Sequence, residues 1–119
     1  MTGLIYKICP RTEWETAQAA GQFSGSGIDL ADGYIHFSTV AQAAETARLH
    51  FSGQAGLVLV AVDTSMLGDA LKWEASRGGN LFPHLYGALS LDAVTAVHPL
   101  PLGDDGTPQL PDLSADAAS

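Results

Sequence analysis

The sequence predicts an α+β fold with one twisted, mainly antiparallel sheet and about two helices packed against it. Short apolar segments with the two-residue period of a strand alternate with turn residues along most of the 119 residues. Two segments in the first half instead repeat apolar residues at helical spacing. Each follows a threonine-x-x-glutamate or threonine-x-x-glutamine pattern, which is typical of a helix start. Few helices among many short strands are typical of an α+β domain.

The chain begins with a strand, a helix and a long loop. Residues 4–9 read as a strand, and Thr12 with Glu15 predicts a helix immediately after it. Trp14 has the helical spacing of a core residue. Residues 22–33 carry three glycines among serines and aspartates. We expect a turn-rich loop there, and loops of this length are more often functional than accidental.

A second strand and a second helix follow the loop. Residues 34–38 alternate as a strand, with Tyr34, His36 and Ser38 on one face. Thr39 and Gln42 form a capping box that begins a helix to about residue 51. The buried stripe that we expect on this helix is Val40, Ala44, Ala47 and Phe51.

The second half of the chain is mostly extended. Residues 57–62 are apolar on both faces, so they predict the central buried strand. A short helix is expected within residues 63–71. Three further strands are expected at residues 71–74, 81–89 and 94–98. The organisation that we predict is a single α+β domain over residues 1–102, followed by an acidic, disordered tail over residues 103–119.

Composition narrows the class of function. Five basic and thirteen acidic residues give a net charge of −8, which disfavours nucleic acid because phosphate binding draws on clustered Lys and Arg. No apolar run approaches the roughly 18 residues of a membrane span, and no signal peptide is evident. The single Cys9 cannot form an internal disulfide. We therefore expect a cytoplasmic protein that binds a small-molecule ligand; a protein partner is unknown.

The most informative block is the strand at residues 34–38. Alternate strand residues lie about 6.5–7 Å apart on one side, so Tyr34, His36 and Ser38 form a polar row. The row ends at a helix N-terminus, which favours anions such as phosphate. A titratable imidazole beside such a helix end is a plausible ligand cradle. The alternative is a histidine hydrogen-bonded inside the sheet, with Ser38 acting only as part of a cap.

Two further blocks carry candidate site residues. His84 and Tyr86 share one face of an expected strand, and they suit a binding wall because one titrates near neutrality and the other stacks and donates. Glu74 follows a tryptophan in an extended segment, so burial there would raise its pKa and suit a base. The alternative for His84 and Tyr86 is an ordinary half-buried strand. The alternative for Glu74 is a salt bridge to Lys72, Arg77 or Lys7. We expect no metal site, since one would require His36, His84 and Glu74 to converge.

These blocks resemble one bacterial family along nearly the whole domain, from about residue 4 to residue 100. The phrases that carry the resemblance are IYKI, EW, DGYIHFST, VAVD, KWE and FPHLYG, in this order. The family is the one known as domain of unknown function 952, to which no activity is assigned. The resemblance implies a fold similar to that of the ADP-ribosyltransferases, compact α+β proteins that hold NAD in a cleft.

The resemblance also implies roles for individual residues. Lys7 lies where relatives often have histidine in the first strand; this is a departure, although a lysine can hold phosphate as a point charge. His36 and Ser38 would occupy the middle element of the site, and Glu74 would supply the acid. His84 and Tyr86 would line the cleft. No resident cofactor is expected, and NAD is the candidate substrate.

The sequence therefore supports two functional hypotheses. The first is an ADP-ribosyltransferase-like enzyme that binds NAD or a related nucleotide, with Glu74 and His36 as catalytic residues and Lys7, Tyr34, Ser38, His84 and Tyr86 as ligand-binding residues. The second is a non-catalytic binding or interaction module on the same fold, which the departure at Lys7 favours. RNA phosphotransfer is a third reaction of this fold, but it needs more basic residues than the five present.

Overall fold

A computed structural model describes residues 3–111 and 113, apart from the side chains of Ile28 and Arg77. It confirms an α+β protein with antiparallel strand pairing. Within these residues there are three α-helices, α1 (Arg11–Ala20), α2 (Ile28–Asp32) and α3 (Val40–His50). The strands are β1 (Leu4–Pro10), β2 (Gln22–Phe23), β3 (Ile35–His36), β4 (Leu57–Asp63), β5 (Leu71–Ala75), β6 (Leu81–Leu85), β7 (Leu89–Ser90) and β8 (Val94–Leu100).

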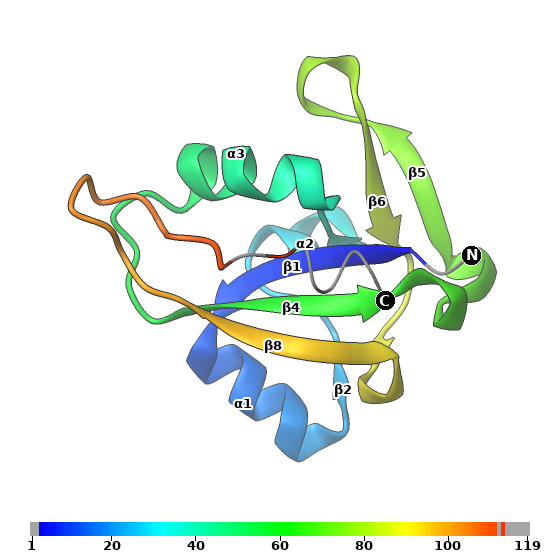
Figure 1. Ribbon diagram of the computed structural model, residues 1–119. Helices are drawn as coiled ribbons and strands as arrows, with labels where there is room; N and C mark the ends of the chain where they lie inside the picture. Colours follow the sequence, from blue (N-terminus) through cyan, green and yellow to red (C-terminus); the bar gives the residue numbers. More distant parts are fainter. Residues whose placement is uncertain (1–2, 112, 114–119) are drawn as a thin grey trace.

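The described strands divide into three antiparallel sheets instead of the single sheet that we expected. The orders are β1-β4-β8, β2-β7 and β3-β6-β5. One isolated pair, Tyr6 with Ser38, joins β1 to the segment after β3; each N–H donates to the other residue's carbonyl at 2.8 Å. Figure 1 shows the β5–β6 hairpin projecting from the body of the molecule.

The largest sheet carries a hydrophobic core on each face. β4 is its central strand and is buried from Leu57 to Val62, as predicted. Val58, Val60 and Val62 face a cluster that includes Trp14 of α1, so the expectation that Trp14 is a core residue is confirmed. Leu57, Leu59 and Ala61 face a second cluster on the opposite side. Figure 1 shows α1 and α3 on opposite sides of this sheet.

The two long helices begin differently from each other. α3 has the predicted capping box, in which the Gln42 N–H donates to Thr39 Oγ1 and the Thr39 N–H donates to Gln42 Oε1. The capping box predicted for Thr12 and Glu15 is wrong, because α1 already begins at Arg11. Strand β1 ends at Pro10 and α1 begins at the next residue. The Arg11 N–H, at the start of this helix, donates to the Gly56 carbonyl at 2.8 Å. A tertiary contact thus replaces the local cap.

The buried face of α3 is rotated relative to the predicted stripe. Ala47 is buried as expected and Phe51 is half-buried, but Ala43 takes the place predicted for Ala44. Val40 is 45% exposed. Small residues on this helix allow it to lie close to β1, so the choice among the alanines depends on packing that the periodicity alone does not give.

Four other expected segments are more irregular than predicted. The loop at residues 22–33 contains β2 and the five-residue helix α2. Only Ile35 and His36 of the predicted strand at residues 34–38 pair within a sheet. The predicted strand at residues 81–89 is divided between β6 and β7. The predicted helix within residues 63–71 is present as two short 3-10 turns, Thr64–Met66 and Gly68–Ala70.

Residues 103–111 run back over the face of the β1-β4-β8 sheet that α3 also covers. The Gly53 N–H donates to the Gly106 carbonyl at 2.7 Å, Leu102 pairs with Pro108, and Leu113 is buried in the cluster around Tyr6. The boundary at residue 102 and the disorder of the tail stay predictions, and residues 112 and 114–119 lie outside the described part. No helix among the described residues is long and apolar enough to cross a membrane.

Candidate functional site

A pocket of about 770 Å³ runs along the edge of β1 that lies opposite β4, beside the Tyr6–Ser38 pair. Three consecutive residues of this strand, Tyr6, Lys7 and Ile8, line it. Successive strand residues point to opposite faces, so the pocket follows the edge of the sheet and reaches both sides. The α2 segment and β3 form one wall, the C-terminal half of α3 forms another, and β6 closes the end.

His36 lies between two aspartates of α2. Its Nδ1 is 2.6 Å from Asp29 Oδ1 and its Nε2 is 3.0 Å from Asp32 Oδ2. The His36 backbone N–H also donates to Asp29 Oδ1 at 3.0 Å. A carboxylate can only accept hydrogen bonds, so the doubly protonated imidazolium is the form that satisfies both contacts. The two aspartates therefore hold the His36 ring in place at the wall of the pocket.

Asp29 organises this wall of the pocket. It is 2% exposed, and its Oδ2 accepts from Lys7 Nζ at 2.7 Å and from the Ser26 N–H at 2.9 Å. Burial opposes ionisation of Asp29, but the Lys7 charge and the hydrogen bonds from Lys7 and His36 outweigh it and lower its pKa. Gly25 packs closely here, because a Cβ on it would come within 3.0 Å of the Asp29 Cβ. The loop thus delivers a buried, ionised carboxylate to β1 and β3.

The second group of rings lies at the β6 end. Tyr34 stacks on His84, with ring centroids 4.4 Å apart and an interplanar angle of 27°. It also contacts the rings of His36 at 4.6 Å and Tyr86 at 4.9 Å. The His36 and His84 centroids are 5.3 Å apart. Segments that are distant in the sequence therefore meet in one continuous cluster of rings.

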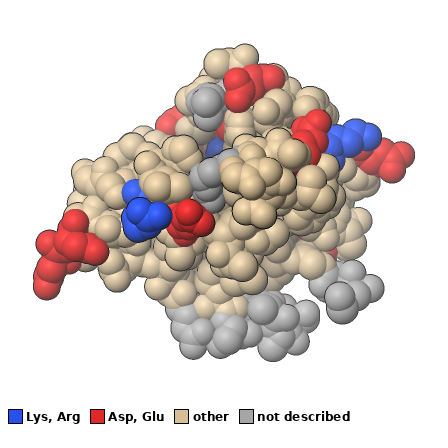
Figure 2. Space-filling model, turned by 90° about the horizontal axis from the view of Figure 1, so that it is seen from above, with Lys and Arg blue, Asp and Glu red and all other residues tan. Residues whose placement is uncertain are grey.

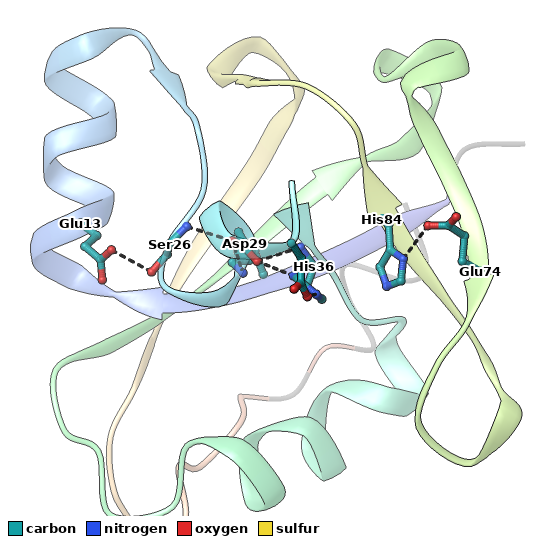
Figure 3. Close-up of polar contacts among 8 residues, drawn as sticks. Glu13, Ser26, Asp29, His36, Glu74 and His84 are labelled. Carbon is teal, nitrogen blue, oxygen red and sulfur yellow. Dashed lines mark hydrogen bonds and ion pairs between the residues drawn. The ribbon is translucent and has the colours of Figure 1, made fainter. Parts of the chain in front are cut away.

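Glu74 on β5 completes this cluster. Its Oε1 accepts from His84 Nδ1 at 2.9 Å and from the Tyr86 hydroxyl at 2.8 Å. These two hydrogen bonds lower the pKa of Glu74, and the bond from the phenol raises the pKa of Tyr86 to about 12. Figure 3 shows Glu13, Ser26, Asp29, His36, His84 and Glu74 in a row that runs from α1 to β5.

Ser38 lies on the α3 side of the pocket. It is buried, and its Oγ is 3.0 Å from Thr46 Oγ1 of α3. Its backbone holds β1 through the paired hydrogen bonds with Tyr6. Both residues line the pocket. Ser38 therefore fixes the pocket wall through its backbone and through its hydroxyl contact with α3.

The family model described as "Protein of unknown function (DUF952)" matches residues 8–97. The chain belongs to the DUF952 family. The crystal structure of CC0527 from Caulobacter crescentus is similar, with a TM-score of 0.88 and 54% identity over 98% of this chain and 99% of that chain. The solution structure of CC0527 has a TM-score of 0.82 and 57% identity, and covers 94% of this chain and 97% of that chain. No curated protein matches the chain significantly.

The structure of this DUF952 protein brings the sequence-predicted residues together, but not all at the same place. The pocket lining includes Lys7, Tyr34, His36, Ser38 and His84. Glu74 and Tyr86 are absent from that lining and lie behind His84, to which Glu74 is bonded. No group of three or more potential ligands with metal-binding geometry occurs among residues 3–111 and 113. The roles of the individual residues stay predictions.

Sequence reasoning missed Asp29 and Asp32 in this DUF952 protein. The sequence predicts a functional loop over residues 22–33, but its pattern singles out no residue within it. The only local signal is two aspartates three residues apart in a glycine-rich segment. Their partners, Lys7 and His36, lie 22 and 7 positions from Asp29, and only the fold shows the pairing.

Proposed function

We propose that the pocket binds NAD or a related nucleotide and that the protein transfers the ADP-ribosyl group. The observation that carries this proposal is the meeting of Tyr34, His36 and His84, from two separate segments, on the wall of one large pocket. Pockets of about 300–1,000 Å³ are typical of small-molecule and cofactor sites, and this one is of that size. The resemblance to the ADP-ribosyltransferases supplies the ligand class.

The charges along the pocket suit this chemistry. Lys7 supplies positive charge for a diphosphate, and the His36 ring would add to it in its doubly protonated form. Glu13 and Asp32 are carboxylates of the pocket lining. Breaking the bond between the ribose and the nicotinamide develops positive charge at the ribose carbon, and fixed carboxylates stabilise such charge. One pocket thus offers a partner for each charge that the reaction requires.

Surface charge supports a small ligand over a nucleic-acid backbone. On the face shown in Figure 2, Lys and Arg are few, and acidic groups lie close to them. Arg48 is one basic residue with an acidic neighbour, since its Nη2 is 3.8 Å from Glu45 Oε1. A polynucleotide would need a continuous basic strip along its phosphates. The positive groups relevant to binding are instead inside the pocket.

The test is a titration of the protein with NAD, ADP-ribose and AMP, followed by amide NMR. We expect shifts concentrated at residues 34–40 and release of nicotinamide from NAD, measured by chromatography. His36→Gln should weaken binding, whereas His98→Gln on β8, outside the pocket lining, should bind as the wild type does. Unchanged amides at residues 34–40 in millimolar nucleotide, with the fold intact, would refute the proposal.

A second candidate is a non-catalytic binding module. Two contacts favour it: the Lys7 charge is already matched by Asp29, and the Glu74 carboxylate is engaged by His84 and Tyr86 outside the pocket lining. Glu74→Gln separates the two candidates. It should reduce nicotinamide release if the protein is an enzyme, whereas a binding module should bind NAD equally well before and after the change and release no nicotinamide.

A further inference from the structure

His84 differs from His36 in having only one ring nitrogen engaged. Its Nδ1 is bonded to Glu74, whereas its Nε2 has no hydrogen-bond partner among the described residues. The side chain is only 4% exposed and nevertheless lines the pocket. An unpartnered nitrogen on a buried ring is costly unless a ligand or water meets it. This nitrogen is therefore available to whatever fills the pocket.

The Glu74 contact determines which nitrogen carries the proton. Glu74 is held as a carboxylate by its two donors, so it can only accept a hydrogen bond from Nδ1. The hydrogen bond made by one ring nitrogen sets the protonation of the other. In the neutral ring, the proton is therefore on Nδ1 and the lone pair is on Nε2. Figure 3 shows Glu74 reaching His84 from β5, on the side away from His36.

The ring is also fixed in orientation. Tyr34 stacks on it, and Tyr86 donates to the same Glu74 oxygen that His84 contacts. Tyr34 and His36 contact the His84 ring, Glu74 is bonded to it, and Tyr86 donates to the same Glu74 oxygen. Lys72 lies opposite His84 in the β5–β6 pair, on the same face of the sheet. A histidine held by a carboxylate, with its second nitrogen free, has the arrangement of a general base.

We propose that His84 is the general base of the site, that its Nε2 accepts the proton of a ligand hydroxyl, and that Glu74 is a positioning residue that fixes its tautomer. This changes the role expected for Glu74, which acts through His84 and does not itself touch the ligand. The substrate class is an alcohol or water as the acceptor.

The step balances under the proposed function, on which this part of the inference rests. The acceptor hydroxyl gives its proton to Nε2 as its oxygen forms a bond to the ribose carbon of NAD. The bond from that carbon to the nicotinamide nitrogen breaks, and neutral nicotinamide leaves with the electron pair. His84 then returns the proton to solvent. No oxidant or reductant is required.

The first test needs no ligand. A long-range proton–nitrogen NMR spectrum of the imidazole rings, recorded where His84 is neutral, should show the proton on Nδ1 in the wild type. In Glu74→Leu the signal should move toward the Nε2–H form, and in Glu74→Gln, whose amide oxygen still accepts from Nδ1, it should stay mainly Nδ1–H. Asp69→Asn, an exposed carboxylate outside the site, should leave it unchanged. A wild-type proton on Nε2 would overturn the inference.

The second test uses ADP-ribose and NAD. Bound ADP-ribose should move the Nε2 signal of His84 and leave Nδ1 in place; an unmoved Nε2 with shifted amides at residues 34–40 would overturn the inference. Loss of a general base typically lowers turnover about 10²–10⁴-fold, so we expect His84→Gln to fall in that range. If the tautomer is as expected but NAD does not bind, the proposed function fails and the assignment of His84 is supported.

Discussion

Replacing Asp29 by asparagine tests the central claim that a buried ion pair builds one wall of the pocket. The asparagine keeps the shape and one acceptor oxygen but removes the charge that faces Lys7. Lys7 is 7% exposed and its Nζ is 2.7 Å from the carboxylate, so its charge would be left buried without a partner. Removing one partner of a buried ion pair costs about 3–5 kcal/mol.

We expect the lower end of that range, because the retained amide oxygen can still accept one of the hydrogen bonds. A loss of about 3 kcal/mol should lower Tm by roughly 10–15 °C in a domain of this size. The measurement is urea unfolding at pH 7, followed by the fluorescence of the buried Trp14. Adding Lys7→Met to Asp29→Asn should recover much of the loss, because it removes the unpaired charge.

The matched control is Asp32→Asn. The Asp32 side chain is 36% exposed and contacts one nitrogen of His36. We therefore expect Asp32→Asn to lower the free energy of unfolding by at most about 1 kcal/mol. A cost below about 1 kcal/mol for Asp29→Asn, in a protein that still folds, would contradict the reasoning from burial.

The pH dependence gives an independent measurement of the same group. The pKa of Asp29 is lower in the folded protein than its ordinary value of 3.8. The unfolded chain therefore takes up this proton first, and the stabilisation is fully present above pH 3.8. It is lost as the pH falls below that value toward the folded pKa. The wild type and Asp29→Asn should therefore differ in free energy of unfolding by a constant amount near neutrality. This difference should become smaller as the pH falls below 3.8.

Three further outcomes are expected. Thr39→Ala should lower the free energy of unfolding by about 1 kcal/mol in urea, because it removes the acceptor of the Gln42 N–H; an unchanged value would contradict the role of the cap. Burial raises the pKa of Cys9 to about 12, so its thiol should react with a disulfide reagent only as the protein unfolds, and fast labelling of the native protein would disprove this. Glu74→Gln should lower the pKa of Tyr86 from about 12 toward 10.0, seen by phenolate absorbance, because the carboxylate that stabilises the protonated phenol is gone.

The elements that could be predicted from the sequence are those whose signal is local. Residues 57–62 are apolar on both faces, and this pattern is typical of a central strand that is buried on both sides. The Thr39–Gln42 box has both of its partners within four residues. The Thr12–Glu15 pattern is equally local, but Arg11 finds the Gly56 carbonyl instead, and this contact depends on where β4 begins. A tertiary hydrogen bond thus decides where α1 starts.

The candidate site was predictable in part for the same reason. Tyr34, His36 and His84 can be predicted because polar rings stand out on otherwise apolar strands. Asp29 cannot, because an aspartate in a glycine-rich loop has the pattern of an ordinary turn residue. The role of Glu74 behind His84 depends on the pairing of β5 with β6, in which Lys72 lies opposite His84. Side-chain direction at that register cannot be read from the sequence.

The placement of Asp29 on α2 also limits protein engineering. Surface loops are normally the first choice for inserting a tag or an extra segment. Here the segment from Phe23 to Gly33 carries the Asp29 side chain that contacts Lys7 and His36. Gly25 has a φ of +123°, and a Cβ on it would lie only 3.0 Å from the Asp29 Cβ. A label placed in this loop would separate a counterion from its cation. The turn at Gly78–Gly79, at the tip of the β5–β6 hairpin, is the better place for such an insertion.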